Sequence, residues 1–276
     1  MYALVALGFV LIYKATETVN FAQGDLMMLG AFFGLTASTI LGWPYWATIL
    51  FAIIVMAAVG MSIERVVIRP VLGYPTFTVV MITIGIGYIL RGVVTMMPGW
   101  GTETYSLKTP FGDSVVRFGG AVLAVEQLAT IGLTAALCLV LYLFFRFAKL
   151  GVAMQATSQN QLAAYYMGVP VKHINSLIWA LSAIVATVAG VLFAPVSLVD
   201  PSNGFYGIKA FAAAVIGGFG SLLGTVLGGL IIGVSETLAA RYLPPGFKEI
   251  VAYLIMLGVL IVRPHGLFST LQRKKV

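Results

Sequence analysis

Few side chains in this sequence could do chemistry, and the most unusual of them interrupt long apolar segments. The first polar stretch is Asn20-Phe21-Ala22-Gln23-Gly24-Asp25, between two apolar runs. If the helix breaks here at membrane depth, the stretch must line a protein-buried or watery cavity, because irregular backbone is tolerated only there. Asn20, Gln23 and Gly24 are then expected to lie on a translocation path. The alternative is a cytoplasmic turn in which Asn20 or Asp25 caps the following helix.

A second unusual stretch, residues 217–233, is rich in glycine. Gly220, Gly224 and Gly228 recur at a spacing that places them on one helix face, where another backbone can approach closely. The glycines just before them predict a break between a short helix and a long one. Broken or half-helices are therefore expected around 20–25 and around 208–221. The residues of this stretch expected on the translocation path are Gly218, Gly220 and Ser221.

The two stretches also share a glycine spacing. Gly24, Gly30 and Gly34 are separated by the same intervals as the series that begins at Gly218. Interrupted helices at corresponding positions of two halves are typical of a transport pathway. A chain with 31 glycines also produces such a shared spacing by coincidence, so both interpretations stay open.

A third stretch, residues 149–172, is polar at first and then amphipathic. Leu162, Tyr165, Tyr166 and Val169 recur at helical spacing, and Gly168-Val169-Pro170 is a typical helix end. No Lys or Arg lies between 150 and 171, whereas a helix that rests on a lipid surface is usually basic. We therefore expect a cytoplasmic loop whose short helix is held by a soluble partner; the alternative is a helix lying on the bilayer.

The elements that position these stretches are membrane-spanning helices. Hydrophobic residues make up 60% of the chain and charged residues only 9%, against about 25% charged residues in a soluble domain. This composition excludes a soluble globular protein, and also a disordered chain. A span needs about 20 apolar residues. Long apolar runs occur at 26–41, 45–63, 77–97, 127–147, 173–194, 222–240 and 249–262, with shorter ones at 1–13 and about 208–219.

These runs predict an all-α polytopic membrane protein with about 8 transmembrane helices in a single transmembrane domain over residues 1–276. All 11 prolines fall between the runs or at their edges, as expected of a residue that ends helices. Pro195, for example, is expected just beyond the run 173–194.

The basic residues predict the orientation, because Lys and Arg concentrate in cytoplasmic loops. The larger group is obtained if the C-terminus is cytoplasmic: Lys14, Arg65, Arg69, Arg146, Lys149, Lys172, Arg263, Arg273, Lys274 and Lys275. The smaller, outer group is Lys108, Arg117, Lys209, Arg241 and Lys248. Trp43, Tyr45, Trp46 and Trp100 are expected at the outer interface. The net charge of +7 therefore reflects topology, and no nucleic-acid partner is expected.

Motifs for catalysis or cofactor binding are missing from the sequence. It has no G-x-x-x-x-G-K-[ST] phosphate loop, so the chain itself is not expected to bind ATP. The two histidines, His173 and His265, lie at membrane edges and do not make a haem or metal site. Spacing assembles no Ser/His/Asp or paired-carboxylate arrangement. We expect neither an enzyme nor a cofactor in this chain.

Two charged residues fall inside predicted spans, Arg91 and Glu236. Ionisable residues within a span are functional candidates by default, whereas a long side chain near a helix end can also snorkel to the headgroups or form a structural pair. Asp25 and Glu236 are expected near interfaces. One alternative function is that of an ion-driven secondary transporter acting alone. The placement of these carboxylates disfavours it, because such a carrier needs a carboxylate at the membrane midplane. A second alternative is a structural membrane protein that moves nothing.

Taken in order, these stretches resemble the LivH-type permease subunits of bacterial ABC importers for branched-chain amino acids. The segments that carry the resemblance are 2–8, 20–24, 62–65 with 69–70, 159–168, 189–192 and 207–233. The family has a longer N-terminus before Tyr2, so the short first run is expected to continue upstream. Asn160-Gln161 stands where the family often has an acidic residue, so no salt bridge to a partner is expected from that position.

The resemblance implies a pore half in the bacterial cytoplasmic (inner) membrane. Its implied partners are a second related permease subunit, two cytoplasmic ATPase subunits that bind ATP and magnesium, and a periplasmic substrate-binding protein. The implied substrate is a branched-chain amino acid, with other amino acids, amides and urea left open. The segment 149–172 matches the family's coupling loop. The residues implied to contact the ATPase are Gln159, Asn160, Ala163, Ala164, Met167 and Gly168.

Overall fold

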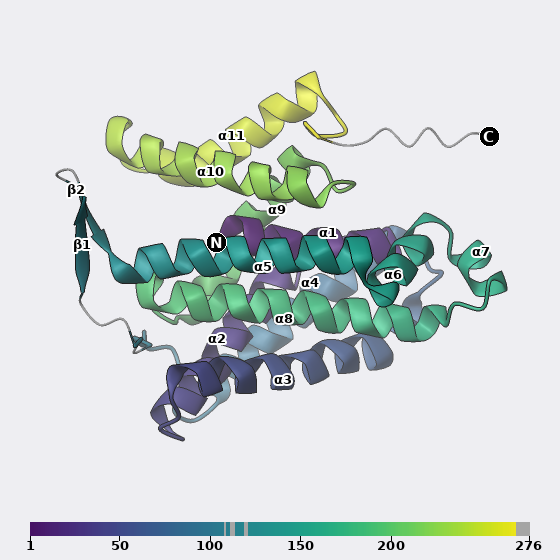
Figure 1. The fold of residues 1–276 in the computed structure, drawn as a ribbon, viewed down its shortest axis with the longest axis horizontal. Coiled ribbons are helices and arrows are strands. Elements are labelled where there is room, and N and C mark those ends of the chain that lie inside the picture. Colours follow the sequence, from purple (N-terminus) through teal and green to yellow (C-terminus); the bar gives the residue numbers. More distant parts are fainter. Residues whose placement is uncertain (108, 111–113, 119–120, 269–276) are drawn as a thin grey trace.

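The chain forms a bundle of helices with one small β-hairpin at one end (Figure 1). The computed structural model describes residues 1–107, 109–110, 114–118 and 121–268. The hairpin pairs β1 (Val115–Phe118) with β2 (Ala121–Ala124) in antiparallel register. The all-α fold class expected from the sequence is confirmed.

Five of the described helices are long and apolar enough to cross a membrane. Their ranges are Tyr45–Ile63 for α3, which continues through shorter helical turns to Val71, Thr76–Met96 for α4, Val125–Phe147 for α5, Val171–Ser197 for α8 and Leu222–Tyr242 for α10. The other predicted spans are shorter helices: α1 (Tyr2–Thr16), α2 (Gln23–Thr39) and α11 (Phe247–Val262). The limits of all eight helices lie close to those of the predicted apolar runs, because the length of an apolar run is visible in the local sequence.

The remaining helices are short connections. A 3-10 helix, η3 (Pro201–Phe205), leads into α9 (Tyr206–Gly217). The predicted coupling loop contains two helices, α6 (Lys149–Gln159) and α7 (Gln161–Tyr166). The first half of that loop, expected to be polar, is therefore helical as well.

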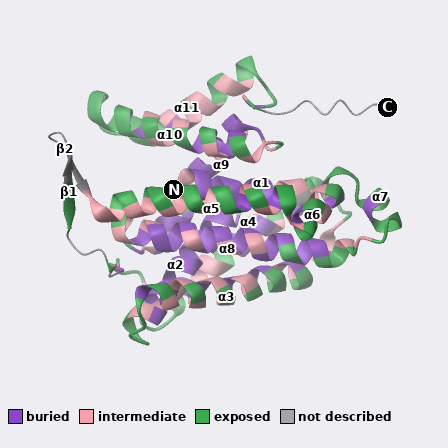
Figure 2. Cartoon of the chain, in the orientation of Figure 1, coloured by how far each residue is buried: buried purple, intermediate pink, exposed green. Residues whose placement is uncertain are grey.

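Helix α8 is the centre of the bundle. It packs against α1, α2 and α3, and 72% of its most apolar stretch is buried, against at most 39% for the other four long helices. Figure 2 shows the buried residues along α8 and α2, while α10 and α11 present exposed residues. The outer faces carry exposed side chains such as Leu50, Ile54 and Leu230. Such apolar faces suit lipid or another membrane subunit.

Proline positions follow the prediction with one exception. Pro44, Pro75 and Pro170 directly precede α3, α4 and α8. Pro195 lies inside α8, which continues to Ser197, so the prediction that every proline lies outside or at the edge of an apolar helix is wrong at this position. A proline this close to a helix end disrupts only the last turn.

The two ends of the bundle differ. Helix α7 and the C-terminal end of α11 lie at one end, opposite the β-hairpin (Figure 1). Trp43 and Trp46 are exposed near the turn from α2 to α3, whereas Trp100 is buried and donates its indole N–H to Thr36 Oγ1 at 2.8 Å. Tyr45 is also buried. Four basic residues used to predict orientation, Lys108, Arg273, Lys274 and Lys275, lie outside the described residues.

Candidate functional site

The first break separates α1 from α2 and lies level with the middle of the bundle. Helix α2 runs in the same direction as α8: Gln23 contacts Ser182, and a methyl group at Gly30 would lie 2.7 Å from the Cα of Thr187. Ser182 is near the middle of α8, so α2 begins only at that depth. Residues 17–22 must therefore turn back from the end of α1 into the bundle. A break is therefore confirmed here, but it covers residues 17–22, and Gln23, Gly24 and Asp25 already belong to α2.

Buried polar side chains satisfy one another at this break. Asn20 and Gln23 are both fully buried. The Asn20 carbonyl oxygen accepts from the Ala22 N–H at 3.1 Å, and its amide donates to Gln23 Oε1 at 3.4 Å. The Ser182 hydroxyl lies 2.9 Å from Gln23 Oε1 and 3.0 Å from the Gly8 carbonyl oxygen. In this conformation the polar groups of the break form hydrogen bonds with other groups of the protein, as buried polar groups generally do.

Gly24 lies where two backbones cross. A methyl group at Gly24 would lie 2.0 Å from the Gly204 carbonyl oxygen and 2.8 Å from the Cα of Gly207. No side chain fits between the beginning of α2 and the beginning of α9 at these distances. Glycine is required at this crossing by space.

Asp25 forms an ion pair and does not cap α2. Its Oδ1 accepts a hydrogen bond from Arg91 Nη2 at 2.7 Å, and no side chain caps the first turn of α2. The hypothesis that Asp25 is a helix cap is therefore wrong, while Asn20 does bind a backbone N–H in the turn. The guanidinium of Arg91 also lies 4.1 Å from the ring centroid of Phe205, within the range of a cation–π interaction.

The depth of Asp25 differs from the prediction. A methyl group at Gly87, in the middle of α4, would lie 2.4 Å from Asp25 Oδ2. The expectation that Asp25 sits near an interface is wrong, because α2 begins at mid-depth. Arg91 is held in a structural pair, which was one of the two interpretations for it, and does not need to snorkel.

A cleft of about 200 Å³ opens beside this ion pair. Its lining residues come from the first break, α4, η3 and α9: Phe21, Asp25, Ile84, Tyr88, Arg91, Gly204, Phe205 and Ile208. Arg91 Nε is buried and has no hydrogen-bond partner among the described residues. Gly87 and Gly204 leave room for the carboxylate, since a methyl group at Gly204 would lie 2.2 Å from Asp25 Oδ1.

The second break separates α9 from α10, as predicted. Gly218 ends α9 with φ 88°, a conformation that favours glycine. Ser221 caps α10, and its hydroxyl oxygen accepts from the Gly224 N–H at 3.0 Å. A short helix and a long helix meet here across four residues of irregular backbone.

The glycine stripe of α10 is a packing surface. A methyl group at Gly224 would lie 2.4 Å from the Gly217 carbonyl oxygen, and one at Gly228 would lie 2.2 Å from that of Ala213. Close helix packing is therefore confirmed at these two positions. Gly220 is exposed with nothing within 4 Å of an added methyl group. Its assignment to the stripe is wrong, because Gly220 precedes α10.

A second buried ion pair joins α9 and α10. Lys209 Nζ lies 2.8 Å from Glu236 Oε1 and 2.7 Å from Glu249 Oε2. Tyr2 donates its hydroxyl to Glu236 at 2.5 Å. Glu236, like Arg91, is thus a member of a structural pair.

The predicted coupling helix is an exposed turn of helix with defined ends. Asn160 caps α7, and its side-chain oxygen accepts from the Ala163 N–H at 2.9 Å. Ala164 is the one buried residue of α7. Gly168 follows with φ 83°, which confirms the predicted helix end. Gln159 and Ala163 are exposed.

Large apolar side chains of α7 and of the residue after it are exposed, and those of Leu162 and Tyr165 also line the pocket beside α8. Leu162, Tyr165, Tyr166 and Met167 are exposed, Tyr166 to 80% and Met167 to 85%. We call these four residues the α7 patch. Contiguous exposed apolar groups mark interaction sites.

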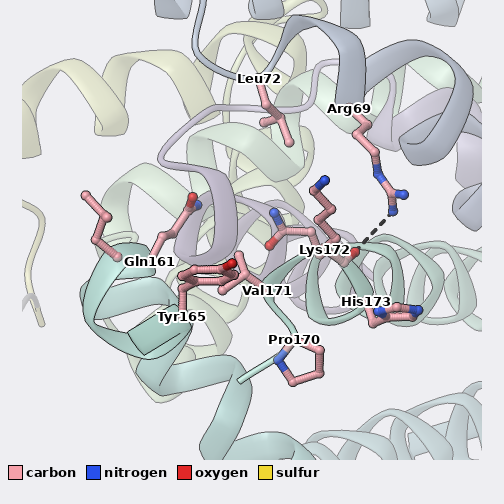
Figure 3. A pocket seen from close by; sticks show the side chains of 10 residues that line it. Arg69, Leu72, Gln161, Tyr165, Pro170, Val171, Lys172 and His173 are labelled. Atoms are coloured by element: carbon pink, nitrogen blue, oxygen red, sulfur yellow. Dashed lines mark hydrogen bonds between the residues drawn. The ribbon is translucent and has the colours of Figure 1, made fainter. Parts of the chain in front are cut away.

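A pocket of about 640 Å³ lies between α7 and the beginning of α8. Figure 3 shows Tyr165 and Gln161 of α7 on one side and Arg69 on the other. Arg69 donates to the Lys172 carbonyl oxygen at 3.1 Å and to Ser176 Oγ at 2.7 Å, and it pairs with Glu64 at 2.8 Å. The end of α3 is therefore tied to the beginning of α8 beside α7.

The structure brings only some of the predicted path residues together. Asn20, Gln23 and Gly24 gather at the first break, whereas Gly218, Gly220 and Ser221 belong to the second. The two breaks are bridged by aromatic rings: the Phe211 ring centroid lies 5.2 Å from that of Phe21 and 5.9 Å from that of Phe219.

Sequence reasoning missed the pairing of Asp25 with Arg91 and the aromatic residues around it. One available signal was that two opposite charges fall within otherwise apolar segments, because charges buried in a membrane usually pair with one another.

Comparison with known proteins gives a consistent result. A family model described as "Branched-chain amino acid transport system / permease component" matches residues 1–260. The chain is 32% identical, over 100% of its length and 93% of the relative's, to the high-affinity branched-chain amino acid transport system permease protein LivH of Escherichia coli (strain K12). It is 32% identical to the corresponding protein BraD of Pseudomonas aeruginosa, over 100% of this chain and 94% of BraD.

A more distant relative is named for the import of a different substrate. The autoinducer 2 import system permease protein LsrC of Yersinia pseudotuberculosis is 26% identical over 94% of this chain and 72% of LsrC. The extent of the family match and the full-length identity decide the assignment: this chain belongs to the family of branched-chain amino acid transport system permease components, and it is an integral membrane protein.

Proposed function

We propose that this chain is the membrane-spanning subunit of an ABC importer that carries branched-chain or related amino acids into the cytoplasm. The observation that supports the proposal most strongly is the family match over residues 1–260, with full-length identity to LivH and BraD. A zwitterion cannot cross about 30 Å of hydrocarbon without partners for its charges. The protein must therefore offer a path that opens to one side at a time.

The partners in this proposal are a second related permease, two cytoplasmic ATPase subunits that bind ATP and magnesium, and a periplasmic substrate-binding protein. The chain would lie in the bacterial inner membrane with α7 and its C-terminus on the cytoplasmic side. The shared end of the bundle occupied by α7 and the end of α11 supports this arrangement (Figure 1). No cofactor would be bound by the chain itself.

The α7 patch is the proposed binding surface for the ATPase. Its four large side chains are exposed on a helix whose ends are fixed by Asn160 and Gly168. The proposed coupling residues are Gln159, Asn160, Ala163, Ala164, Met167 and Gly168. Of these, the buried Ala164 holds α7 in place, while Met167 would enter the partner.

The proposed path runs near the two breaks. Asn20 and Gln23 are bonded to each other and to Ser182, so a solute would reach them only when α1 or α8 moves. Nucleotide can drive such a motion only if it binds the two conformations with different affinity. Gly24, Gly218, Gly220 and Ser221 remain the other proposed positions of this path.

Uptake by vesicles tests the proposal. We expect proteoliposomes with this chain alone to take up no leucine, and vesicles with the sister permease, ATPases, loaded binding protein and ATP to accumulate it. An ion-driven carrier would work alone under a proton or sodium gradient. Leucine uptake by the isolated chain would therefore overturn the proposal.

Variants in the α7 patch test the docking surface. Tyr166→Asp and Met167→Asp place a charge on exposed positions, so we expect normal folding but loss of ATPase co-purification and of uptake. Tyr166→Phe keeps the ring and serves as the matched control, with uptake close to that of the unchanged protein. Normal ATPase binding by both aspartate variants would show that α7 does not seat the partner.

A further inference from the structure

We propose that the cleft beside Asp25 and Arg91 binds the transported amino acid during its passage. The Asp25 carboxylate would receive the α-ammonium group, the Arg91 guanidinium would receive the α-carboxylate, and the apolar wall would hold the side chain. This inference rests on the function proposed above and names the site within the membrane at which the solute is recognised.

The first observation is the unused binding capacity of the ion pair. A guanidinium carries five N–H donors in a planar fork, yet Arg91 reaches Asp25 through Nη2, and its buried Nε has no partner among the described residues. A carboxylate accepts two parallel hydrogen bonds from such a fork. Asp25 uses Oδ1 for Arg91, which leaves Oδ2 to accept from an ammonium group.

The second observation is the shape and lining of the cleft. Its volume of about 200 Å³ equals that of roughly seven liquid waters at about 30 Å³ each, which suits a small solute. Beside the charges, the lining includes Ile84 and Tyr88 of α4 and Ile208 of α9. Apolar walls with a few polar groups that fix orientation are typical of small-molecule sites.

Two glycines make room for the Asp25 carboxylate beside this cleft. A methyl group at Gly87 or Gly204 would lie 2.4 Å or 2.2 Å from an Asp25 carboxylate oxygen. The carboxylate therefore reaches α4 and η3 because both positions lack a side chain. The Phe205 ring, 4.1 Å from the Arg91 guanidinium, supports the cation from one side.

The third observation concerns which face of the protein carries the cleft. Tyr88, Phe205 and Ile208 are exposed on this face, and Arg91 and Asp25 lie beside them at the depth of the middle of α4. Charged side chains inside a membrane almost always face a protein interior or a water-filled cavity. This face must therefore be covered by the sister permease or line the path, because bare lipid would be a poor solvent for it.

Stability alone does not account for the pair. Replacing a buried ion pair by well-packed hydrophobic residues of similar volume is often neutral or stabilising, whereas removing one partner is costly. A zwitterion that enters the cleft brings one charge for each member of the pair, so no charge is left unpaired during binding.

A double variant separates the binding role from a structural one. Asp25→Asn with Arg91→Gln removes both charges together, so the chain should insert and assemble normally. In proteoliposomes with the partner subunits, loaded binding protein and ATP, we expect leucine uptake per complex to fall by about tenfold or more, since charge-assisted bonds to the solute are lost. ATP hydrolysis per complex should persist.

The matched control removes a different buried ion pair. Lys209→Met with Glu236→Gln eliminates an ion pair of 2.8 Å between α9 and α10, outside the cleft. We expect uptake within about twofold of the unchanged complex, because no binding free energy for the solute is lost. Equal uptake by both double variants would overturn the inference.

A photoreactive diazirine analogue of leucine gives a readout that a structural role would not produce. Irradiation during turnover should label peptides that contain Ile84 and Tyr88 or Phe205 and Ile208, and the Asp25→Asn/Arg91→Gln variant should lose this label. Labelling elsewhere only, or labelling unchanged by the variant, would contradict the site. If the unchanged complex transports no amino acid, the proposed function fails; if it transports and the double variant matches it, only the site fails.

Discussion

The two breaks in the bundle are stabilised by different interactions. Between α1 and α2, the turn lies among buried side chains, and Asn20, Gln23 and Ser182 bond one another across it. Between α9 and α10, the turn relies on close backbones and one helix cap, and it reaches the surface at Gly220.

The difference follows from depth. A break in the interior has no water to satisfy its polar groups, so side chains must do so. A break that reaches the surface needs only glycine geometry and a cap. Substitutions at the first break should therefore cost more free energy of unfolding than substitutions at the second, and a graded series of variants can test this order.

The largest effect is expected from Gly24→Val. Its first carbon would lie 2.0 Å from the Gly204 carbonyl oxygen, so the beginning of α2 must separate from α9. Overpacking against backbone should lower the free energy of unfolding by about 3 kcal/mol or more. The loss of stability is followed as the fraction of protein that stays monodisperse after heating in detergent. Gly85→Val is the control, because nothing lies within 4 Å of a methyl group there; equal melting of the two variants would contradict the crossing.

Gln23→Leu should have the next largest effect. It removes the acceptor for the Asn20 amide and the contact with the Ser182 hydroxyl, leaving a buried amide donor without a partner. The expected cost is about 2 kcal/mol, measured by the same heating series. Gln127→Leu replaces an exposed glutamine and should change little. A Gln23→Leu protein as stable as this control would mean that the network does not hold the first break.

At the second break, Ser221→Ala should cost about 1 kcal/mol, the usual worth of a helix cap. The Gly224 N–H would lose its acceptor. Ser221→Asp restores an acceptor at the same position and should recover most of the lost stability. A larger loss than that of Gln23→Leu would reverse the proposed order of the two breaks.

The smallest effect is expected from Gly220→Ala. The position is exposed, its φ is not positive, and nothing lies within 4 Å of the added methyl group. The substitution should raise stability by about 0.5 kcal/mol through the unfolded chain, which a melting shift of a degree or two at most would report. A clear loss would reveal a contact at Gly220 that the described residues do not contain.

The parts of this protein that local sequence could predict are the spans and the positions of both breaks. Apolar length and glycine or proline placement act within about twenty residues, so the limits of α3 and α5 follow directly from them. The pair of Asp25 and Arg91 could not be placed in this way, because it joins residues 66 positions apart. Its existence depends on where α2 begins beside α4, a consequence of packing.

The predicted coupling loop also combines features that local sequence could predict with features that depend on packing. The end of α7 at Gly168 was predictable from turn chemistry, and the amphipathic pattern identified the exposed side chains. The pocket between α7 and α8 was not predictable, since it requires Arg69 of a distant segment to bind Lys172 and Ser176. Helix α6 could have been found, because Lys149–Gln159 holds no proline and a single glycine.

Helix α8 runs from the pocket at α7 to the buried hydrogen bonds of the first break. Its first residues border the pocket at α7, and Ser182, about 16 Å further along at 1.5 Å per residue, touches the amide of Gln23. The helix has no proline between Val171 and Ser182, so this segment behaves as a stiff rod. A tilt applied at its Val171 end would therefore move Ser182 and the hydrogen bonds that it shares with Gln23 and Gly8.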